Sequence, residues 1–262
     1  MTLRLEKKIA IVTGGGSGIG QASAISFAKE GAHVFMLDRT VEKAEKTKQC
    51  IENNGGRADV VECDISKPEM VENAMKKVAE RTGHIDIIFA NAGVNGKLSP
   101  IETMELEDWD QTMSINMRGT FATVKYAIPY MKDNGGSIII NSSINGNRVF
   151  SNIGFSAYAS TKAGQAAFMK MAALELARYK IRVNSIHPGA IETEIDAKTD
   201  RSDDLEKVQI QVEYPEGGHP LAGEAGKPEQ VANLVLFLAS DEASHVSGTE
   251  VYVDGAESLL RG

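Results

Sequence analysis

Short apolar runs alternate with longer amphipathic segments along almost the whole chain. The apolar runs predict strands at residues 7–13, 32–38, 58–63, 85–90, 137–141, 182–186 and 250–253. The segments with helical periodicity predict helices at residues 18–30, 41–54, 68–81, 101–132, 157–179 and 230–239. Strands and helices that alternate in this way form a parallel sheet with helices on both faces. No linker-like change in composition interrupts this α/β pattern, so we expect a single domain over residues 1–262.

Composition and charge exclude several classes of partner. An apolar content of 42% is enough for a core, and the net charge of -8 argues against nucleic acid or an anionic membrane as a partner. No apolar run is long enough to span a bilayer, and the first residues lack the apolar stretch of a secretory signal, so we expect a cytoplasmic protein. Cys50 and Cys63 lack metal-site spacing, and we expect free thiols and no metal.

A glycine-rich stretch, Thr13-Gly14-Gly15-Gly16-Ser17-Gly18-Ile19-Gly20, separates the first predicted strand from the first predicted helix. A strand, a tight turn and a helix in this order place backbone N–H groups and a helix N-terminus against a phosphate. Glycines suit such a turn because a side chain would hold the phosphate away. A glycine-rich loop without a ligand is the alternative. The position directly after the first strand favours a nucleotide.

Acidic residues end the next two predicted strands, and in a sheet of this kind the ligand lies beyond the strand ends. A carboxylate at Asp38 can accept hydrogen bonds from an adenosine ribose diol and would repel a 2′-phosphate. Asp38 therefore favours NAD over NADP, as does Ser17, which stands where a basic residue would assist NADP. Arg39 could instead receive a phosphate, and Asp38 could be a turn residue. Asp64 could contact the adenine or cap a helix.

Tyr158 and Lys162 lie near the start of a predicted helix, one helical turn apart and therefore on one face. A free tyrosine, with a pKa near ~10, is a poor base at neutral pH. A nearby ammonium group favours the phenolate and lowers that pKa, so the tyrosine becomes a usable acid or base for an alcohol–carbonyl pair. Such a pair also occurs by chance on exposed helices, and alone it decides nothing.

Taken together, these motifs resemble the classical short-chain dehydrogenase/reductase family over nearly the whole chain. The matching residues are Thr13-Gly14-x-x-x-Gly18-x-Gly20, Asn91-Ala92-Gly93, Asn116, Ser143, Tyr158-x-x-x-Lys162, Pro188-Gly189 and the tail from Ser247-Gly248 to Val253-Asp254-Gly255. Each motif is weak alone, but their order and spacing together are specific. The resemblance implies a Rossmann-type, doubly wound sheet of about seven strands and hydride transfer between a nicotinamide cofactor and a small-molecule substrate.

The resemblance also implies roles for four residues. Tyr158 would be the general acid/base toward the substrate oxygen. Lys162 would bind the nicotinamide ribose and lower the tyrosine pKa. Ser143 would hydrogen-bond the substrate, and Asn116 would hold a water that links Lys162 to solvent. The implied cofactor-binding residues are Gly14, Ser17, Gly18, Ile19, Gly20, Asp38, Asp64, Ile65, Asn91, Ala92, Gly93, Tyr158, Lys162, Pro188, Gly189, Ile191 and Thr193, with Thr193 on the nicotinamide carboxamide.

The chain departs from the family pattern in three places. At the usual spacing before Tyr158 stands Asn145, so we infer a loop two residues longer and keep Ser143, with Ser142 and Ser156 as rivals. Where the family has two asparagines before the Ala-Gly pair, this chain has Ala90 and Asn91, so one supporting asparagine is missing. The tail reads Asp254-Gly255-Ala256 rather than ending in two glycines, and its last turn could differ.

The polar segment over residues 190–225 is interpreted as a flap over the substrate. It is poor in large apolar side chains and rich in charge, at Glu194, Asp196, Lys198, Asp200, Arg201, Asp203 and Asp204. A polar substrate, such as a sugar or hydroxy acid derivative, suits it better than a steroid. Arg148 could meet an anionic group or be a solvated loop residue. His187 and Asn141 are interpreted as structural, or for His187 as substrate-adjacent.

Two other functions stay open. One is an NADPH-dependent 3-oxoacyl-thioester reductase with the same fold. The other is a non-catalytic NAD(P)-sensing protein, which would have no need to keep Asn116, Ser143, Tyr158 and Lys162. Two predicted helices have apolar faces suited to association, formed by Phe121, Val124, Ile128, Ala163, Ala166, Phe168 and Leu174. The family usually pairs such helices between subunits, which implies a homotetramer or a homodimer.

Overall fold

The structure is a computed structural model that describes residues 3–195, 199–208, 210 and 217–261. Asp196 and Lys198 of the predicted flap lie outside the described residues. Within these ranges seven parallel strands form one sheet, as expected, and their order is β3-β2-β1-β4-β5-β6-β7. The strands are β1 (Ile9–Thr13), β2 (His33–Asp38), β3 (Arg57–Glu62), β4 (Ile87–Ala90), β5 (Gly136–Asn141), β6 (Ile181–Pro188) and β7 (Glu250–Val253). The strand order reverses between β1 and β4, which is where such sheets bind ligands.

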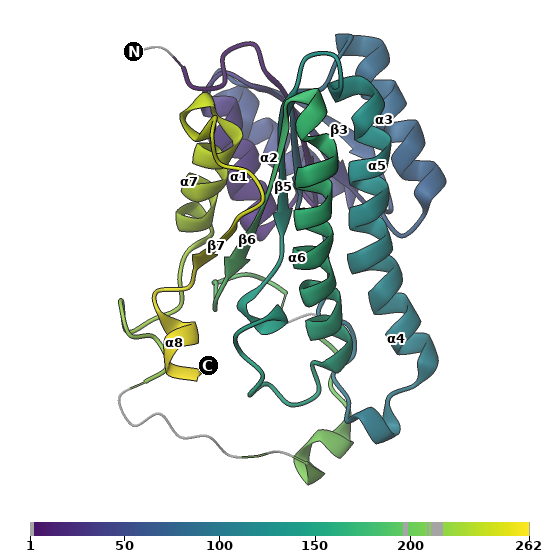
Figure 1. Cartoon of the computed structure of the whole chain (residues 1–262), viewed down its shortest axis with the longest axis vertical. Helices are drawn as coiled ribbons and strands as arrows, with labels where there is room; N and C mark the ends of the chain where they lie inside the picture. The colour runs from purple at the N-terminus through teal and green to yellow at the C-terminus, as the bar shows by residue number, and fades with distance from the viewer. Residues whose placement is uncertain (1–2, 196–198, 209, 211–216, 262) are drawn as a thin grey trace.

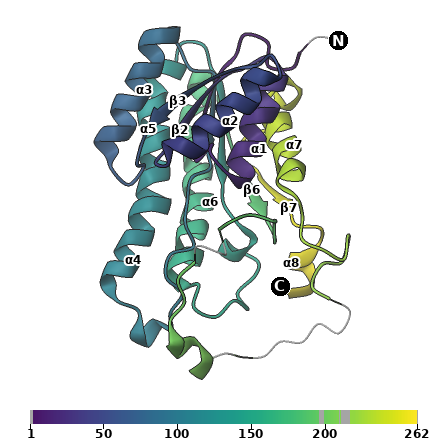
Figure 2. The ribbon, with the colours of Figure 1, turned by 180° about the vertical axis from the view of Figure 1, so that it is seen from behind.

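Helices cover both faces of the sheet (Figures 1 and 2). They are α1 (Gly18–Lys29), α2 (Val41–Asn53), α3 (Pro68–Thr82), α4 (Leu106–Met113), α5 (Gly119–Met131), α6 (Ser156–Leu176), α7 (Pro228–Ala239) and α8 (Glu257–Arg261). Helices α1, α2 and α7 pack on one face, and α3, α5 and α6 pack on the other. The prediction of a doubly wound α/β fold is confirmed.

Alternating strand residues supply the two cores. In β2, Phe35 and Leu37 belong to the core under α3, α5 and α6, while Val34 and Met36 belong to the core under α1, α2 and α7. Successive side chains of a strand point to opposite faces, so an unbroken apolar run is what a sheet covered on both sides requires. This arrangement fixes the strands, and their carboxyl ends then form one rigid edge.

The helix expected over residues 101–132 is wrong in detail. The structure has a 3₁₀ turn, η1 (Ile101–Thr103), then α4, a π-helical turn η2 (Ser114–Arg118) and α5. In the π turn the main-chain carbonyl of Asn116 accepts hydrogen bonds from the side chains of Gln165 (2.9 Å) and Thr120 (2.7 Å). These bonds accompany a local change in the helical pattern, and π turns of this kind are frequent at functional sites.

The C-terminal helix α8 was not predicted, because five residues are too few to show a period. It lies near the ends of β6 and β7, at the edge of the sheet that carries the motifs (Figure 1). Cys50 and Cys63 are both free, in agreement with the sequence. None of the helices within the described ranges combines the length and hydropathy that crossing a bilayer requires.

Candidate active site

A cavity of about 1120 Å³ lies at the carboxyl ends of the strands. It brings together residues that are far apart in sequence, from the glycine-rich stretch after β1 to the residues after β6. The predicted site residues that line it are Gly14, Ser17, Gly18, Ile19, Asp38, Asp64, Ile65, Asn91, Ala92, Gly93, Ser143, Tyr158, Lys162, Pro188, Gly189, Ile191 and Thr193. Two others, Gly20 and Asn116, are buried behind its wall.

The glycine-rich stretch has the shape that a phosphate-binding turn requires. Gly14 (φ +69°) and Gly18 (φ +52°) adopt backbone conformations that favour glycine. A Cβ on Gly20 would lie 2.1 Å from the carbonyl oxygen of Gly14, so only glycine lets α1 begin this close to the turn. Helix α1 starts at Gly18, with Ser17 as its N-cap. The turn and the helix N-terminus therefore fit a pyrophosphate.

Asp38 ends β2 and is oriented by the backbone around it. Its Oδ2 accepts the N–H of Gly16 (2.9 Å), and its Oδ1 accepts the N–H of Thr40 (2.8 Å). A carboxylate has about four acceptor positions, so both oxygens can also accept bonds from a vicinal diol. Arg39 lines the same cavity. The carboxylate fits an unphosphorylated adenosine ribose, while Arg39 keeps the phosphate alternative open.

Asp64 lies at the adenosine side of the cavity and is also engaged locally. Its Oδ1 accepts hydrogen bonds from the N–H (3.0 Å) and the hydroxyl (2.7 Å) of Ser66. Partial burial acts to raise the pKa of this carboxyl, but the Ser66 bonds, with Arg39 and Lys67 nearby, outweigh burial and leave its pKa below the usual range. The structure supports the turn role of Asp64 and leaves an adenine contact as a prediction.

Asn91 joins the ends of three strands. Its side-chain amide donates to the carbonyl of Thr13 (3.0 Å), and its Oδ1 accepts from Asn141 (2.9 Å). The Thr13 hydroxyl accepts the N–H groups of Asn91 (2.9 Å) and Ala92 (3.0 Å). Asn91 and Thr13 thereby fix β1, β4 and β5 relative to one another beneath the cavity.

Lys162 is a buried amine beside the tyrosine. It is 4% exposed, and its Nζ donates to the carbonyl of Asn141 (2.7 Å) and lies 5.4 Å from the centre of the Tyr158 ring. Burial lowers the pKa of Lys162 to about 7. Asn141 was expected to be structural, but its carbonyl holds the lysine. A backbone acceptor of this kind has no sequence signature.

Asn116 lies in the π turn between α4 and α5, and its side chain contacts the segments that line the cavity after β4 and on α6. Its side-chain oxygen accepts the N–H of Val94 (2.9 Å), and its amide donates to the Val94 carbonyl (2.8 Å) and the Thr161 hydroxyl (3.1 Å). A Cβ on Gly93 would meet Asn116 Oδ1 at 3.1 Å. Asn116 therefore fixes the segment after β4 against α6. The proton relay that the resemblance implies stays a prediction.

Three serines compete for the substrate-binding role. Ser143 lines the cavity, and its hydroxyl accepts the N–H of Asn145 (3.2 Å). The hydroxyl of Ser142 donates to the carbonyl of Lys162 (2.8 Å). The hydroxyl of Ser156 donates to the sulfur of Met104 (3.8 Å). Ser142 thus holds helix α6, and the geometry favours Ser143 for a substrate oxygen.

Two residues interpreted from the sequence, His187 and Arg148, support the loop that carries Ser143. His187 is fully buried, and its Nδ1 is 3.1 Å from the carbonyl oxygen of Ser143. Burial lowers the pKa of His187, so the ring is neutral at pH 7 and donates from Nδ1. The guanidinium of Arg148 lies 3.4 Å from the centre of the Tyr252 ring and donates to the hydroxyl of Ser258 (3.3 Å). Arg148 supports the loop rather than lining the cavity.

The described part of the predicted flap returns to the end of β6. The N–H of Glu192 donates to the carbonyl of Gly226 (2.9 Å), and the N–H of Gly226 donates to the carbonyl of Ala190 (2.9 Å). An ion pair joins Glu194 to Lys43 of α2, across the glycine-rich stretch. The segment therefore borders the cavity on its open side.

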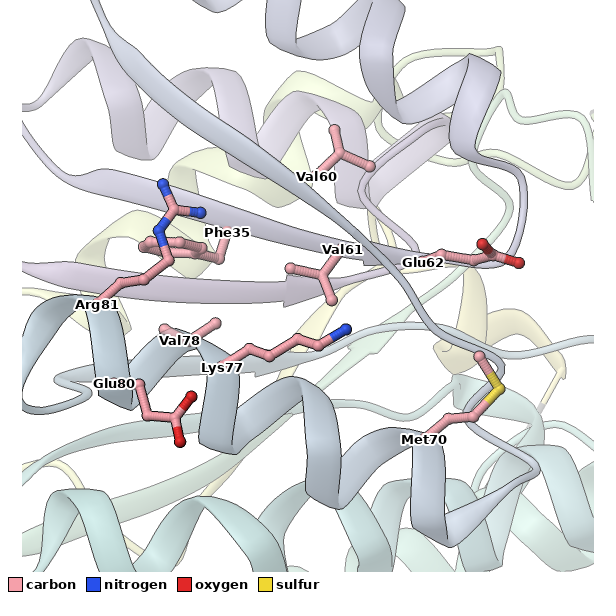
Figure 3. Close-up of a pocket in the computed structure, with 9 residues that line it drawn as sticks. All are labelled: Phe35, Val60, Val61, Glu62, Met70, Lys77, Val78, Glu80 and Arg81. Atoms are coloured by element: carbon pink, nitrogen blue, oxygen red, sulfur yellow. The ribbon is translucent and has the colours of Figure 1, made fainter.

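A second cavity, of about 570 Å³, lies apart from these motifs between the edge strand β3 and helix α3 (Figure 3). The guanidinium of Arg81 covers the Phe35 ring at 5.3 Å and pairs with Asp59 (3.1 Å). Figure 3 shows Lys77 beside Val61 along this groove. Its charged groups of both signs at an edge strand are typical of protection against strand pairing.

The glycine turn, the strand-end aspartate and the tyrosine–lysine pair define a Rossmann-type oxidoreductase. A family model described as enoyl-(acyl carrier protein) reductase matches residues 14–256. The chain belongs to the short-chain dehydrogenase/reductase family, as the sequence resemblance indicated.

Similar proteins cover almost the whole chain. An uncharacterized oxidoreductase of Bacillus subtilis (strain 168), YxbG, is 38% identical over 96% of this chain and 91% of its own length. The 3-oxoacyl-[acyl-carrier-protein] reductase FabG of Thermotoga maritima is 35% identical over 97% of this chain and 98% of its own. Cyclohexanol dehydrogenase of an Acinetobacter species (strain SE19) is 35% identical over 98% of this chain and 97% of its own.

Solved structures show the same fold. A 3-ketoacyl-ACP reductase from Sinorhizobium meliloti 1021 superposes with a TM-score of 0.93 at 43% identity, over 97% of this chain and all (100%) of that one. Carveol dehydrogenase from Mycobacterium avium, solved in complex with NAD, superposes with a TM-score of 0.87 at 28% identity, over 99% of this chain and 100% of that one.

Proposed function

We propose that the protein transfers hydride between NAD(H) and a polar secondary alcohol or its ketone. The observation that carries this proposal is a single cavity lined by Asp38, at the end of β2, and by Tyr158, which lies beside the buried Lys162 on α6. The relatives named cyclohexanol dehydrogenase and carveol dehydrogenase support an alcohol as substrate, and the NAD in the carveol dehydrogenase complex supports the cofactor.

The cofactor supplies the hydride chemistry when it is bound. Gly14–Gly20 would hold its pyrophosphate, Asp38 its adenosine ribose, and Pro188–Thr193 its nicotinamide. Tyr158 would exchange a proton with the substrate oxygen, because its phenol reaches the cavity from the first turn of α6. A protonated Lys162 would favour the phenolate. The Ser143 hydroxyl would hydrogen-bond the same substrate oxygen.

The substrate end of the cavity supports a polar ligand. Side chains of Asn145 and Asn152 line it and are joined by a hydrogen bond of 2.9 Å. Lys97 and Arg201 also line it, with Lys97 paired to Asp108 (3.4 Å). Amides and charges at such a wall favour hydroxyl or other polar groups over hydrocarbon, because an apolar ligand would leave them without solvent or partners.

An NADPH-dependent 3-oxoacyl-thioester reductase is the second candidate. It is supported by the relatives named 3-oxoacyl-[acyl-carrier-protein] reductase and 3-ketoacyl-ACP reductase, and by Arg39 at the cavity wall. Asp38 and Ser17 argue against it. A purely sensing role is disfavoured, because such a protein would have no reason to keep Tyr158 and Lys162 in this arrangement.

An oxidation screen tests the proposal. Sugars, hydroxy acids and simple cyclic alcohols are offered with NAD and with NADP, and ketone reduction is followed in parallel with a 3-oxoacyl thioester. The proposal expects turnover with NAD and a preference for polar alcohols. A preference for apolar ketones would contradict the polar site, and turnover confined to NADPH and the thioester would establish the second candidate instead.

A further inference from the structure

The short C-terminal helix α8 places a carboxylate in the wall of the cavity. Glu257 is 4% exposed, and it lines the same cavity as Tyr158 and Asp38. No sequence motif marked it, because it lies beyond the family tail at Asp254-Gly255. A buried carboxylate needs hydrogen-bond partners, and the turn that follows β6 supplies Glu257 with one of them.

Glu257 contacts that turn closely at two adjoining residues. Its Oε2 accepts the N–H of Ala190 at 2.8 Å. A Cβ added to Gly189 would lie 2.7 Å from the same oxygen, so only glycine allows the carboxylate to approach. The carbonyl of Ala190 is held on its other side by the N–H of Gly226 (2.9 Å). The turn is therefore fixed by α8 through one peptide group and by the returning segment through the next.

The chain takes on backbone strain to bring Glu257 there. Ala256 has φ +68°, a conformation that an L-residue other than glycine rarely adopts. Asp254 supports the turn, because its two carboxylate oxygens accept the N–H groups of Ala256 (3.1 Å) and Ser258 (3.0 Å). His219, from the returning segment, lies 4.0 Å from Glu257 Oε2. Three segments thus converge on one carboxylate.

We propose that Glu257 is a positioning residue that holds the Pro188–Thr193 turn in the shape that receives the nicotinamide half of the cofactor. This inference rests on the proposed function, which assigns that turn to the nicotinamide. Glu257 acts through the N–H of Ala190, and the contacts with Ala190, Gly189 and His219 described above all lie away from Asp38 at the other end of the cavity. Its loss should therefore weaken binding of the nicotinamide half alone.

Binding of two ligands distinguishes an effect on the nicotinamide half of the cofactor from an effect on the adenosine half. NADH carries both halves of the cofactor, whereas ADP-ribose lacks the nicotinamide, and calorimetry measures both dissociation constants on the full-length protein. In Glu257→Ala the NADH affinity should fall about tenfold, as expected for a lost buried hydrogen bond to a charged group, while ADP-ribose affinity stays within about twofold. Glu257→Gln keeps an acceptor oxygen and should restore most of the NADH affinity. Leu259→Ala, at a position 73% exposed in the same helix, is the matched control and should change neither.

A second variant guards against loss of folding in the first. In Gly189→Ala the new Cβ would lie 2.7 Å from the Glu257 carboxylate and 2.8 Å from the Cβ of Asp254. It therefore pushes the carboxylate and the tail away from the turn, and the same selective loss of NADH affinity is expected. Equal losses for NADH and ADP-ribose in both variants, or no loss in either, would overturn the inference. Failure of the wild-type protein to bind NADH at all would instead overturn the proposed function, so the two results are distinguishable.

Discussion

At the scale of the residue, Lys162 is chemically the least ordinary group in the site. An amine that is 4% exposed and held by a backbone carbonyl loses hydration that the charge needs. The resulting pKa of about 7 lets the side chain change charge near neutral pH. The same burial lowers the free energy of unfolding, because the Lys162 amine binds its proton more tightly in the unfolded chain than in the folded protein.

Replacing Lys162 with methionine should therefore stabilise the protein in a pH-dependent way. Between a folded pKa of about 7 and the ordinary value of 10.5, the unfolded state binds more protons than the folded state, so wild-type stability rises with pH. We expect the gain in the free energy of unfolding of Lys162→Met over wild type to be larger by about 4 kcal/mol near pH ~6 than near pH ~10. Urea unfolding across this pH range measures the difference, and a difference that does not change with pH would contradict the burial argument.

At the other end of the cavity, Asp38 is the residue to which we attribute the proposed preference for NAD. Asp38→Asn keeps an acceptor for the backbone but removes the charge that repels a 2′-phosphate, while Arg39 stays beside it. We expect the ratio of kcat/KM with NADP to kcat/KM with NAD to rise about tenfold or more. Asp64→Asn is the matched control at the next strand end and should change this ratio less. An unchanged ratio in Asp38→Asn would remove the case for NAD.

Residues with a special backbone or a fixed spacing could be predicted from the sequence. Gly14 and Gly18, Asp38 and the Tyr158–Lys162 pair all reach the one cavity. Residues that act through a main-chain group could not be predicted, because every residue has a main-chain carbonyl whatever its side chain. Asn141 is the example, since its carbonyl holds Lys162.

At the scale of the element, the loop between β5 and α6 is held from behind by β6 and β7. His187 of β6 contacts the Ser143 carbonyl, and its ring lies 5.0 Å from the Tyr252 ring of β7. Asn147 of the loop donates to the Tyr252 hydroxyl (2.7 Å). The loop that carries the candidate serine therefore takes its shape from two strands as well as from its own sequence.

His187→Leu should lower kcat about tenfold, because the Ser143 carbonyl loses its donor and the serine loses its position. NADH affinity should stay unchanged. His187→Asn retains a short N–H donor and should recover much of the activity. Steady-state kinetics and NADH titration measure both effects. Leucine and asparagine variants with equal kcat would refute a positioning role for the histidine.

Clear periodicity in the sequence predicted the long helices, and the exceptions depend on a tertiary contact or on the length of the element. Residues 101–132 have helical periodicity throughout. Asn116 nevertheless lies in a π turn, where its main-chain carbonyl accepts a hydrogen bond from the side chain of Gln165. That bond comes from α6, so it depends on tertiary packing that a local pattern does not contain. The helix α8 was missed for the simpler reason that it is one turn long.

At the scale of the whole molecule, apolar side chains remain exposed on α5 and α6. Phe121 is 47% exposed, Met171 56% and Leu174 75%, and the Phe121 and Phe168 rings meet edge to face at 5.8 Å. Exposed apolar groups gathered on neighbouring helices are typical of a subunit interface. The pairing of subunits through this face, in a homotetramer or a homodimer, stays a prediction of the family resemblance.

Leu174→Glu should break that pairing, because it places a charge in an apolar contact. We expect light scattering after size exclusion to show a smaller assembly than the wild type. Leu221→Glu is the control, since Leu221 is 82% exposed on the segment that returns from the flap. If the assemblies of wild type and Leu174→Glu have the same mass, the interface lies elsewhere.

The central claim is that Tyr158 exchanges a proton with the substrate while Lys162 supports it. The most direct measurement compares wild type with Tyr158→Phe, using the best alcohol from the screen for kcat and fluorescence titration for NADH affinity. The account predicts that kcat falls by about 10³-fold or more and that NADH affinity stays within about threefold. A phenylalanine variant that keeps its turnover would contradict it.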